Sequence, residues 1–316
     1  MSILLLSNKW DISIDFIVNI LRKKNVSYIR INTEDLIDEP VTVNIPNFSF
    51  MLKTRFKSIN LVQDLKSVYL RRPGKPFEFS DNKPKESIIN YVTDQWHSLI
   101  SGIQAIPDIL WINNPLKNNF AEIKINQLFL ANKIGLKIPE TCITSEKKSL
   151  ELFWSKCNQK IIAKALYSPL IKDKNEEFFI FTNQILKIDD IDEEDLKISP
   201  TIFQEALIEK TDYRITVIGD KCFTVKILSN GSIKSLDWRT LKENIKFVRC
   251  DLPSDLEEKC IKLVKEFGLV FGAIDIVQSG DEYYFLEINP NGEWGWLQKS
   301  AGLPIAESIA DKLCEV

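Results

Sequence analysis

The 316-residue sequence contains only one histidine, His97, and so gives little support for chemistry that depends on imidazole. A Ser-His-Asp triad would rest entirely on this residue, which lies in the helical stretch 94–100, and we interpret it as a structural side chain. The six cysteines are scattered, with no C-x-x-C pair and no histidine at ligand spacing. We therefore expect buried, reduced thiols and no zinc site.

The sequence also lacks the signals of dinucleotide, membrane and nucleic-acid binding. No G-x-G-x-x-G follows the first predicted strand, which argues against a Rossmann cofactor site. No run of 18 apolar residues occurs, and residues 1–7 do not form the basic start of a signal peptide. A net charge of −3 offers no broad basic face for phosphate backbones. We expect a cytoplasmic protein, with no nucleic acid and no membrane among its partners.

What is present is typical of a soluble globular protein, with 44% hydrophobic and 27% charged residues. The length suits two or three domains, with room for a ligand cleft between them. Residues 3–6, 14–24 and 28–31 alternate strand, helix and strand, which is the βαβ pattern of a doubly wound parallel sheet. Asn114-Pro115 is typical of a boundary, so we end this N-terminal domain, 1–114, at that point.

Further elements follow from periodicity and from helix and turn signals. Gly135 is placed to end one helix as a glycine with positive φ. We expect helices over 84–104, 121–134, 150–156 and 254–267, strands over 160–165 and 178–181, and mostly strands from 201 to 249.

The most informative segment is 270–292, where two apolar runs flank a Ser-Gly-Asp-Glu turn, a β-hairpin signal. Glu287 and Asn289 are two residues apart on one strand, so their side chains share a face. If the loop has an odd number of residues, for example 280–282, Asp275 lies opposite Glu287 on that face. Facing carboxylates repel one another. A hard cation removes the penalty, because Mg²⁺ prefers Asp, Glu and Asn oxygens when it also holds phosphates.

The alternative is a hairpin whose polar residues simply face solvent. Both flanking runs are apolar on both faces, through Ile274, Ile276, Phe285, Leu286 and Ile288. A carboxylate in such surroundings is costly unless it has a partner. We therefore predict a metal site formed by Asp275, Glu287 and Asn289.

Two lysines and a polar strand supply the groups that a nucleotide needs. Lys124 lies at a helix start, and Lys164 interrupts an apolar strand, where an anion such as a phosphate would offset its cost. The strand edge at 201–208 has exposed backbone groups for an adenine, and nearby acids can accept from ribose hydroxyls. We predict a nucleotide site made by Gln204, Glu205, Ala206, Leu207 and Asp212 together with the two lysines.

Two arginines complete the predicted site. Arg214 lies on a strand beside the metal hairpin and can hold a phosphate or carboxylate in fork geometry, and Arg239 is a second such cation.

The order of these elements resembles the ATP-grasp superfamily from about residue 115 to the C-terminus. The matching residues are Lys124, Lys164, Gln204-Glu205, Asp212-x-Arg214, Arg239, Asp275 and Glu287-x-Asn289-Pro290. Three further stretches resemble the graspetide synthetases, the microviridin-type ATP-grasp ligases that mature ribosomal peptides. These stretches are Leu-Arg-Arg-Pro at 70–73, Trp-Ile-Asn-Asn-Pro at 111–115 and Asn-Pro-Asn-Gly-Glu-Trp-Gly-Trp-Leu at 289–297.

The resemblance implies a mixed α/β and α+β protein with the ATP-grasp fold. An N-terminal doubly wound pre-ATP-grasp domain would be followed by a central subdomain, 115–200, and a C-terminal subdomain, 201–316. ATP would bind between these two subdomains, with Mg²⁺ joining its phosphates to the hairpin. An Asp or Glu side chain of a precursor peptide, made of leader and core, would become an acyl phosphate. A Ser or Thr hydroxyl or a Lys amine would then close an ω-ester or ω-amide ring. Arg214 would steady the acyl phosphate, and the resemblance also suggests a homodimer.

Some features leave alternatives open. The loop 166–175 contains no glycine, where the superfamily often has a glycine-rich flap, although its Lys172 and Lys174 could still cover a nucleotide. Trp294 and Trp296 suit core packing and a substrate pocket equally. The competing functions are a ligase that joins an amino acid to a small acid or a peptide end, and a non-catalytic nucleotide-responsive peptide-binding protein.

Overall fold

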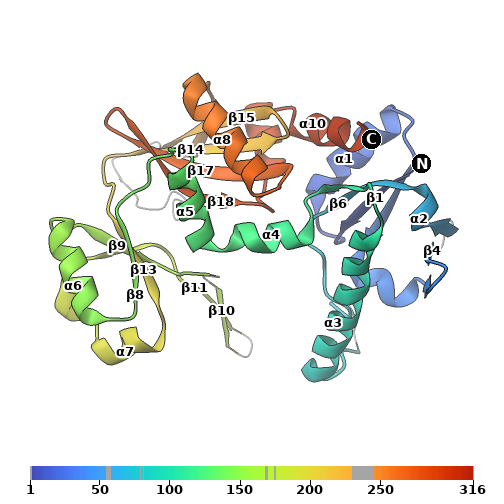
Figure 1. Cartoon of the computed structure of the whole chain (residues 1–316), viewed down its shortest axis with the longest axis horizontal. Coiled ribbons are helices and arrows are strands. Elements are labelled where there is room, and N and C mark those ends of the chain that lie inside the picture. The colour runs from blue at the N-terminus through green and yellow to red at the C-terminus, as the bar shows by residue number, and fades with distance from the viewer. Residues whose placement is uncertain are drawn as a thin grey trace.

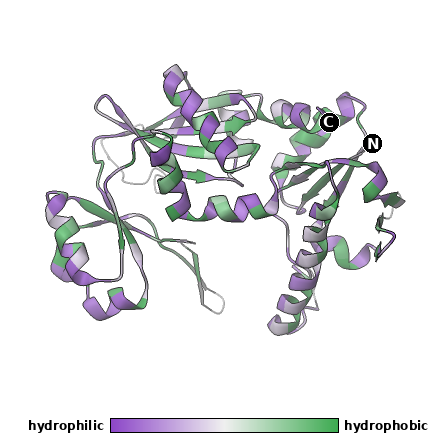
Figure 2. Ribbon diagram, in the orientation of Figure 1, coloured by the Kyte–Doolittle hydropathy of each residue, from purple (hydrophilic) through white to green (hydrophobic). Residues whose placement is uncertain are grey.

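The computed structural model describes residues 2–54, 58–78, 80, 82–167, 170–173, 176–229 and 245–315. Its elements form three main sheets that lie along the molecule, with helix α4 running between the N-terminal sheet and the other two (Figure 1). Both termini lie at the same end of the molecule. The strands are largely hydrophobic, whereas the helices carry much of the polar surface (Figure 2).

The N-terminal sheet is parallel, as the βαβ pattern predicts, with strand order β2-β1-β6-β7. Side chains alternate between its faces, so Leu5 packs with α1 and α10 on one side and Leu4 packs toward Trp111 on the other. Helices therefore cover a sheet that is buried on both faces. Its elements are β1 (Ser2–Ser7), α1 (Ile12–Lys23), β2 (Tyr28–Asn32), β6 (Leu65–Leu70) and β7 (Leu110–Ile112).

A smaller antiparallel sheet and a long helix extend this part of the chain. Helix α3 (Glu86–Gly102) agrees closely with the predicted helix over 84–104, yet none of its residues is buried. The remaining elements here are η1 (Thr33–Asp38), β3 (Val41–Asn44), β4 (Ser49–Lys53), β5 (Ser58–Asn60), α2 (Leu61–Asp64) and η2 (Ile103–Ala105).

The helix predicted over 121–134 is wrong in one respect, because two helices meet there. Helix α4 (Pro115–Glu122) ends and α5 (Lys124–Lys133) begins on either side of Ile123, whose backbone is extended. Because α4 ends here, the carbonyl of Ala121 accepts a hydrogen bond from the Gln127 side chain, at 2.6 Å, in place of a helical N–H. Gly135 ends α5 with a φ of 84°, as predicted.

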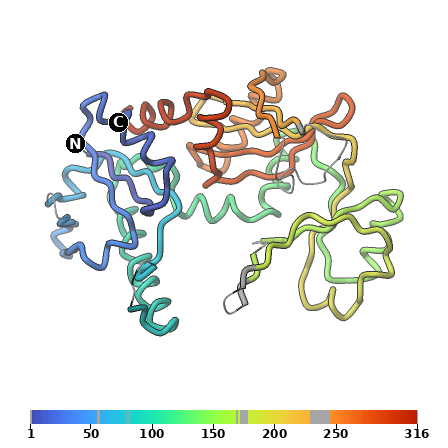
Figure 3. Tube along the Cα trace, turned by 180° about the vertical axis from the view of Figure 1, so that it is seen from behind, coloured from blue at the N-terminus to red at the C-terminus, as the bar shows by residue number. Residues whose placement is uncertain are grey.

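The second sheet is antiparallel, with strand order β12-β9-β13-β8, and helix α6 packs against it. A separate hairpin, β10 (Leu170–Asp173) and β11 (Glu176–Phe179), projects from it, so the strand predicted over 178–181 begins and ends earlier. Figure 3 shows this hairpin and α3 extending in the same direction from either side of α4. The other elements are β8 (Thr141–Thr144), α6 (Lys147–Lys156), β9 (Ile161–Lys164), β12 (Asn183–Ile185), η3 (Ile188–Asp190), α7 (Glu193–Ile198) and β13 (Thr201–Glu205).

The third sheet is antiparallel, with strand order β16-β15-β14-β17-β18. The last helix returns to the N-terminal sheet, where the Ser67 hydroxyl donates to the Leu313 carbonyl at 2.8 Å, so the first and last parts of the chain share one core. The elements are β14 (Thr211–Ile218), β15 (Lys221–Ser229), β16 (Ile245–Arg249), α8 (Ser254–Glu266), β17 (Phe271–Ser279), β18 (Glu282–Asn289), α9 (Gly295–Ala301) and α10 (Ile305–Cys314).

Two negative expectations concern the whole chain. Among the helices of the described residues, none has the length and apolarity to cross a membrane. All six cysteines are free thiols, although only Cys157 and Cys260 are buried, so the expectation of uniform burial is wrong for the other four.

Candidate functional site

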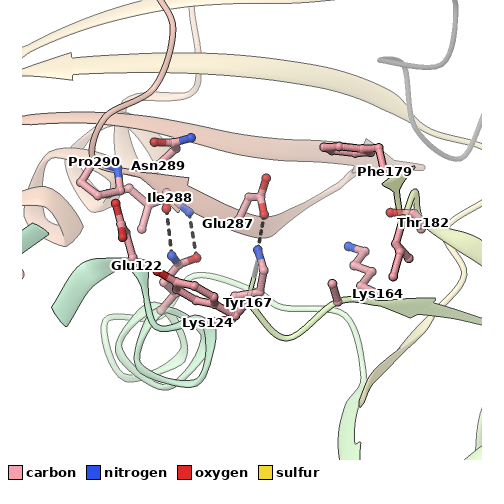
Figure 4. Close-up of a pocket in the computed structure, with 13 residues that line it drawn as sticks. Glu122, Lys124, Lys164, Tyr167, Phe179, Thr182, Glu287, Ile288, Asn289 and Pro290 are labelled. Atoms are coloured by element: carbon pink, nitrogen blue, oxygen red, sulfur yellow. Dashed lines mark hydrogen bonds and ion pairs between the residues drawn. The ribbon is translucent and has the colours of Figure 1, made fainter. Parts of the chain in front are cut away.

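A pocket of about 460 Å³ lies where the second and third sheets face helices α4 and α5 (Figure 4). Lys164 from β9 and Glu287 from β18 lie on opposite walls, and Phe179 at the end of hairpin β10–β11 closes one side. The residues that line the pocket are Glu122, Lys124, Gln127, Lys164, Ala165, Tyr167, Phe179, Ile180, Thr182, Glu287, Ile288, Asn289 and Pro290.

Strands β17 and β18 form the predicted hairpin, and Asp275 pairs with Glu287 across it. The predicted odd loop is wrong, because Ser279 pairs with Glu282 around a two-residue turn. The register instead shifts at a bulge, where Leu286 is the additional residue. Asp275 and Glu287 therefore face each other as expected, by a different route.

Each carboxylate of this pair already has a cation. Arg214 pairs with Asp275 in register on β14, and its Nε lies 2.9 Å from Asp275 Oδ1. Lys124 Nζ lies 2.6 Å from Glu287 Oε2. The Asp275 side chain is 15% exposed and that of Glu287 is 28% exposed, so both are shielded enough for these charges to matter.

Asn289 extends the same oxygen-bearing face toward a tight loop. Its Oδ1 accepts from the Asn291 backbone N–H at 2.9 Å. A Cβ on Gly292 would lie 2.3 Å from that of Ala273, so only glycine lets the loop cover the sheet here, close to the Arg214 guanidinium.

The oxygen set suits a hard cation. Within the described part of the chain, no three His, Cys, Asp or Glu side chains gather as a metal site. Two facing carboxylates and a neighbouring amide oxygen are nevertheless the donor types that Mg²⁺ takes when phosphates and water complete its coordination. The assignment of Asp275, Glu287 and Asn289 as ligands stays a prediction.

Lys164 is held at the pocket by a short hydrogen-bond chain. Its Nζ donates to Gln204 Oε1 at 2.9 Å, and Gln204 Nε2 donates to Thr141 Oγ1 at 3.0 Å. Gln204 is buried, and its side chain orients Lys164 at the pocket.

The remaining predicted nucleotide residues lie outside the pocket lining. The backbone N–H groups of Glu205 and Ala206 donate to the carbonyls of Glu140 and Lys160, each at 2.9 Å. Leu207 follows them, half-buried. Asp212 pairs with Lys210 at 2.6 Å, and Arg239 lies outside the described residues.

Glu122 and Gln127 are among the pocket residues that the sequence did not indicate. Glu122 ends α4 at the pocket and accepts from Asn291 Nδ2 at 3.3 Å. Gln127 completes the edge of β18, because its side chain accepts from the Ile288 N–H at 3.1 Å and donates to the Ile288 carbonyl at 2.9 Å. Gln127 lies three residues after Lys124 on a predicted helix, so the two side chains share a face. This spacing was the signal in the sequence that could have placed Gln127 at the pocket.

The three stretches that carry the graspetide resemblance meet at one joint. Arg71 is 2% exposed, and its guanidinium lies 3.1 Å from Asp11 Oδ2, lies 2.7 Å from Glu293 Oε2 and donates to the Gly292 carbonyl at 3.0 Å. Burial opposes ionisation of Glu293, but the Arg71 charge and the Ser13 hydroxyl outweigh it and lower the Glu293 pKa.

Asn113 and Trp294 fasten the same joint from both sides. Asn113 Oδ1 accepts from the Phe271 N–H at 2.8 Å, and Asn113 Nδ2 donates to the Pro290 carbonyl at 3.0 Å. Trp294 is fully buried and its Nε1 donates to the Tyr69 hydroxyl at 3.1 Å, so Trp294 is a core residue. Trp296 is partly buried against the ring of Phe247.

Comparison with known proteins gives full-length structural likeness. The chain is similar to the macrocyclase MdnC of Microcystis aeruginosa, solved with the precursor peptide MdnA, with a TM-score of 0.86 and 26% identity over 100% of both chains. It is equally similar to a RiPP-associated ATP-grasp ligase of Chryseobacterium gregarium, solved with ADP and a leader and core peptide. That TM-score is 0.87, with 27% identity over 99% of this chain and 96% of the other.

Sequence comparison reaches less far. A tetrahydromethanopterin:alpha-L-glutamate ligase of Methanocaldococcus jannaschii is 22% identical over 108 residues, which is 34% of this chain and 36% of that protein. No protein-family model matches the chain.

The fold and the cation-lined pocket at the β17–β18 hairpin define an ATP-grasp ligase. Within that superfamily, the likeness over the whole length is to ligases of the graspetide-synthetase type.

Proposed function

We propose that this chain is an ATP-dependent macrocyclase that joins side chains of a ribosomally made precursor peptide. The observation that carries the proposal is the row Arg214, Asp275 and Glu287, which lies in register across three strands and meets Lys124 at the pocket. A binding protein has no need for such paired charges at its pocket. The similar Chryseobacterium ligase binds ADP and a peptide, which supports ATP as the co-substrate here.

The residues of the pocket divide the work of carboxylate activation. Lys164 and Lys124 would hold phosphate oxygens, and Asp275, Glu287 and Asn289 would hold Mg²⁺, which neutralises charge on the phosphates during transfer. Arg214, directly across from Asp275, is placed to steady the acyl phosphate of a peptide Asp or Glu. Lys124 would exchange its present partner, Glu287, for a phosphate.

Glu122 is the remaining acid of the pocket and suits the second half-reaction. The attacking Ser or Thr hydroxyl, or neutral Lys amine, must lose a proton as its oxygen or nitrogen bonds to the acyl carbon and phosphate leaves. Glu122 lies beside Pro290, on the far side of Glu287 from Lys164 (Figure 4), and its carboxylate can take that proton. The product is an ω-ester or ω-amide ring.

The wider setting is part of the same proposal. We extend it to a domain division at residues 114 and 200, and to a homodimer. We also include a cytosolic location and the absence of a nucleic-acid partner. Six free thiols suit a reducing compartment. The partial match to a glutamate ligase favours a second candidate, which joins an amino acid to a small acid or a peptide end.

Mass measurement of the peptide separates these functions. The purified protein is incubated with Mg-ATP and the candidate precursor peptide encoded beside its gene. Loss of whole waters is expected from macrocyclisation, whereas gain of an amino-acid mass would support the second candidate. An unchanged peptide with bound nucleotide would overturn both and favour a peptide-binding protein.

A matched pair of variants tests the pocket. Glu287→Gln should abolish ADP formation and ring closure, because the amide cannot replace a charged ligand. Glu282→Gln, on the same strand but exposed at the turn, should react like the parent protein. Turnover by Glu287→Gln at the parental rate would defeat the site assignment.

A further inference from the structure

A second pocket, of about 290 Å³, lies in the N-terminal part of the molecule beside α3. Its walls are apolar, built mainly from Leu36, Leu70, Pro73, Trp96 and Ile100. No acidic side chain is among the described residues that line it, and Lys75 and His97 are the only lining side chains that can carry charge. His97 was interpreted from the sequence as a structural side chain, but it is exposed and lines this pocket, so it is not packed in the interior.

The position of the second pocket in the sheet is one that binds ligands in other proteins. Thr33 directly follows β2, residues 73–76 follow β6 and Pro115 follows β7, so the pocket opens at the carboxyl ends of parallel strands. The chain passes from β1 to β2 on one side and later from β6 to β7 on the other. The topological switch point of the sheet therefore lies between the neighbouring strands β1 and β6. Ligands of doubly wound sheets bind in this crevice.

The two pockets share a wall. Asn291 lines the second pocket, and its Nδ2 donates to Glu122 Oε1, which lines the first, at 3.3 Å. On the other side, Asn118 Nδ2 donates to Asn291 Oδ1 at 3.2 Å. Asn118 is buried, so this polar contact forms an inner part of the wall that the two pockets share.

We propose that the second pocket binds an apolar side chain of the core segment of the precursor peptide, within a few residues of the one that attacks the acyl phosphate. This inference rests on the proposed macrocyclase function. The volume of about 290 Å³ is large enough to take an apolar side chain of a peptide, including an aromatic one. The shared wall at Asn291 favours the core over the leader, because only residues near the reacting ones can occupy both pockets together.

Filling the pocket from its helical side tests this inference. Thr93 on α3 lines the pocket, so Thr93→Trp should occupy it. Gln95→Trp places the same ring on the same helix at an exposed position outside the lining. Thr93→Trp should lower kcat/KM for ring closure roughly 10- to 100-fold, the effect of losing one buried apolar side chain. Gln95→Trp should match the parent, and both variants should keep the parental thermal midpoint and ADP affinity.

An alanine scan of the core peptide identifies the occupant. One apolar core residue should lose as much kcat/KM on change to Ala as Thr93→Trp does, and the two changes together should cost no more than either alone. Parental activity of Thr93→Trp, or additive losses at every core position, would overturn the inference. Non-additive losses between Thr93→Trp and a change in the leader would show that a leader residue occupies the pocket, and would also overturn the inference. If the parent protein removes no water from the peptide, the proposed function itself fails.

Discussion

At the scale of single residues, the pocket is a set of opposite charges already paired in the absence of ligands. Asp275 has Arg214 and Glu287 has Lys124, so neither carboxylate is an uncompensated buried charge. If these acids hold Mg²⁺ as proposed, they would exchange Arg214 and Lys124 for the metal when it binds. Glu122 differs from them, since its described partner is the neutral amide of Asn291.

We expect Glu122→Gln to separate the two half-reactions. An amide cannot take the proton of the attacking group, so ring closure should fall by about 10²- to 10⁴-fold. Phosphorylation of the peptide carboxylate should continue, and hydroxylamine should trap the acyl phosphate as a hydroxamate that mass spectrometry detects. Glu151→Gln, an exposed change on α6, is the control. Loss of hydroxamate together with the ring would instead assign Glu122 to the nucleotide site.

At the scale of elements, the break between α4 and α5 decides where the pocket lies. The extended backbone of Ile123 turns the chain so that α5 begins with Lys124 beside Glu287. Gln127, one turn later, pairs with both backbone groups of Ile288 as another strand would. Helix α5 thereby covers the edge of β18 that carries the predicted metal ligands.

Gln127→Met tests the role of this side chain in stability. The substitution conserves volume but leaves the carbonyls of Ala121 and Ile288 and the N–H of Ile288 without their partner. We expect a loss of about 2–3 kcal/mol in the free energy of unfolding, measured by urea denaturation. Asn126→Ala, which removes an exposed hydrogen bond to Phe120, should cost less than about 1 kcal/mol. Equal losses in the two variants would contradict this role.

At the scale of the whole molecule, the N-terminal sheet and the β17–β18 hairpin are fastened together by buried polar groups. Arg71 and Asn113, at the ends of β6 and β7, both hold the loop that follows β18. This loop directly follows Asn289, so the sheet that builds the second pocket also fixes the end of the predicted metal site. Arg71 and Arg72, which lie in one of the stretches that resemble the graspetide synthetases, both pair with Glu293 and so contribute to domain docking.

The lowered pKa of Glu293 makes this joint sensitive to acid. The folded state favours the ionised form, so its stabilising effect is present at neutral pH and is lost as pH falls below the unfolded-state pKa and through the lower folded-state pKa. Glu293→Gln should be less stable than the parent at neutral pH and should lose less stability over that acidic window. Urea denaturation across pH 3 to 7 measures both slopes, with the exposed Glu258→Gln as control. Parallel curves for parent and Glu293→Gln would refute the assignment.

The sequence by itself determined the parallel N-terminal sheet and the β17–β18 hairpin, whereas the bulge that brings Asp275 opposite Glu287 appears only in the structure. The sheet and the hairpin follow from alternation, periodicity and turn residues, which are local properties of the chain. The family likeness was also readable, because several ordered motifs occur together.

Only the tertiary structure decided which groups those motifs meet. Glu122 in the pocket and Trp294 buried against Tyr69 each depend on a partner more than 140 residues away in the sequence. The break of the helix at Ile123 depends on the Gln127 side chain, which replaces a backbone hydrogen bond. No local pattern predicts these contacts. Long-range pairing of this kind is set by the packing of whole sheets and helices, and periodicity within a single segment carries no information about it.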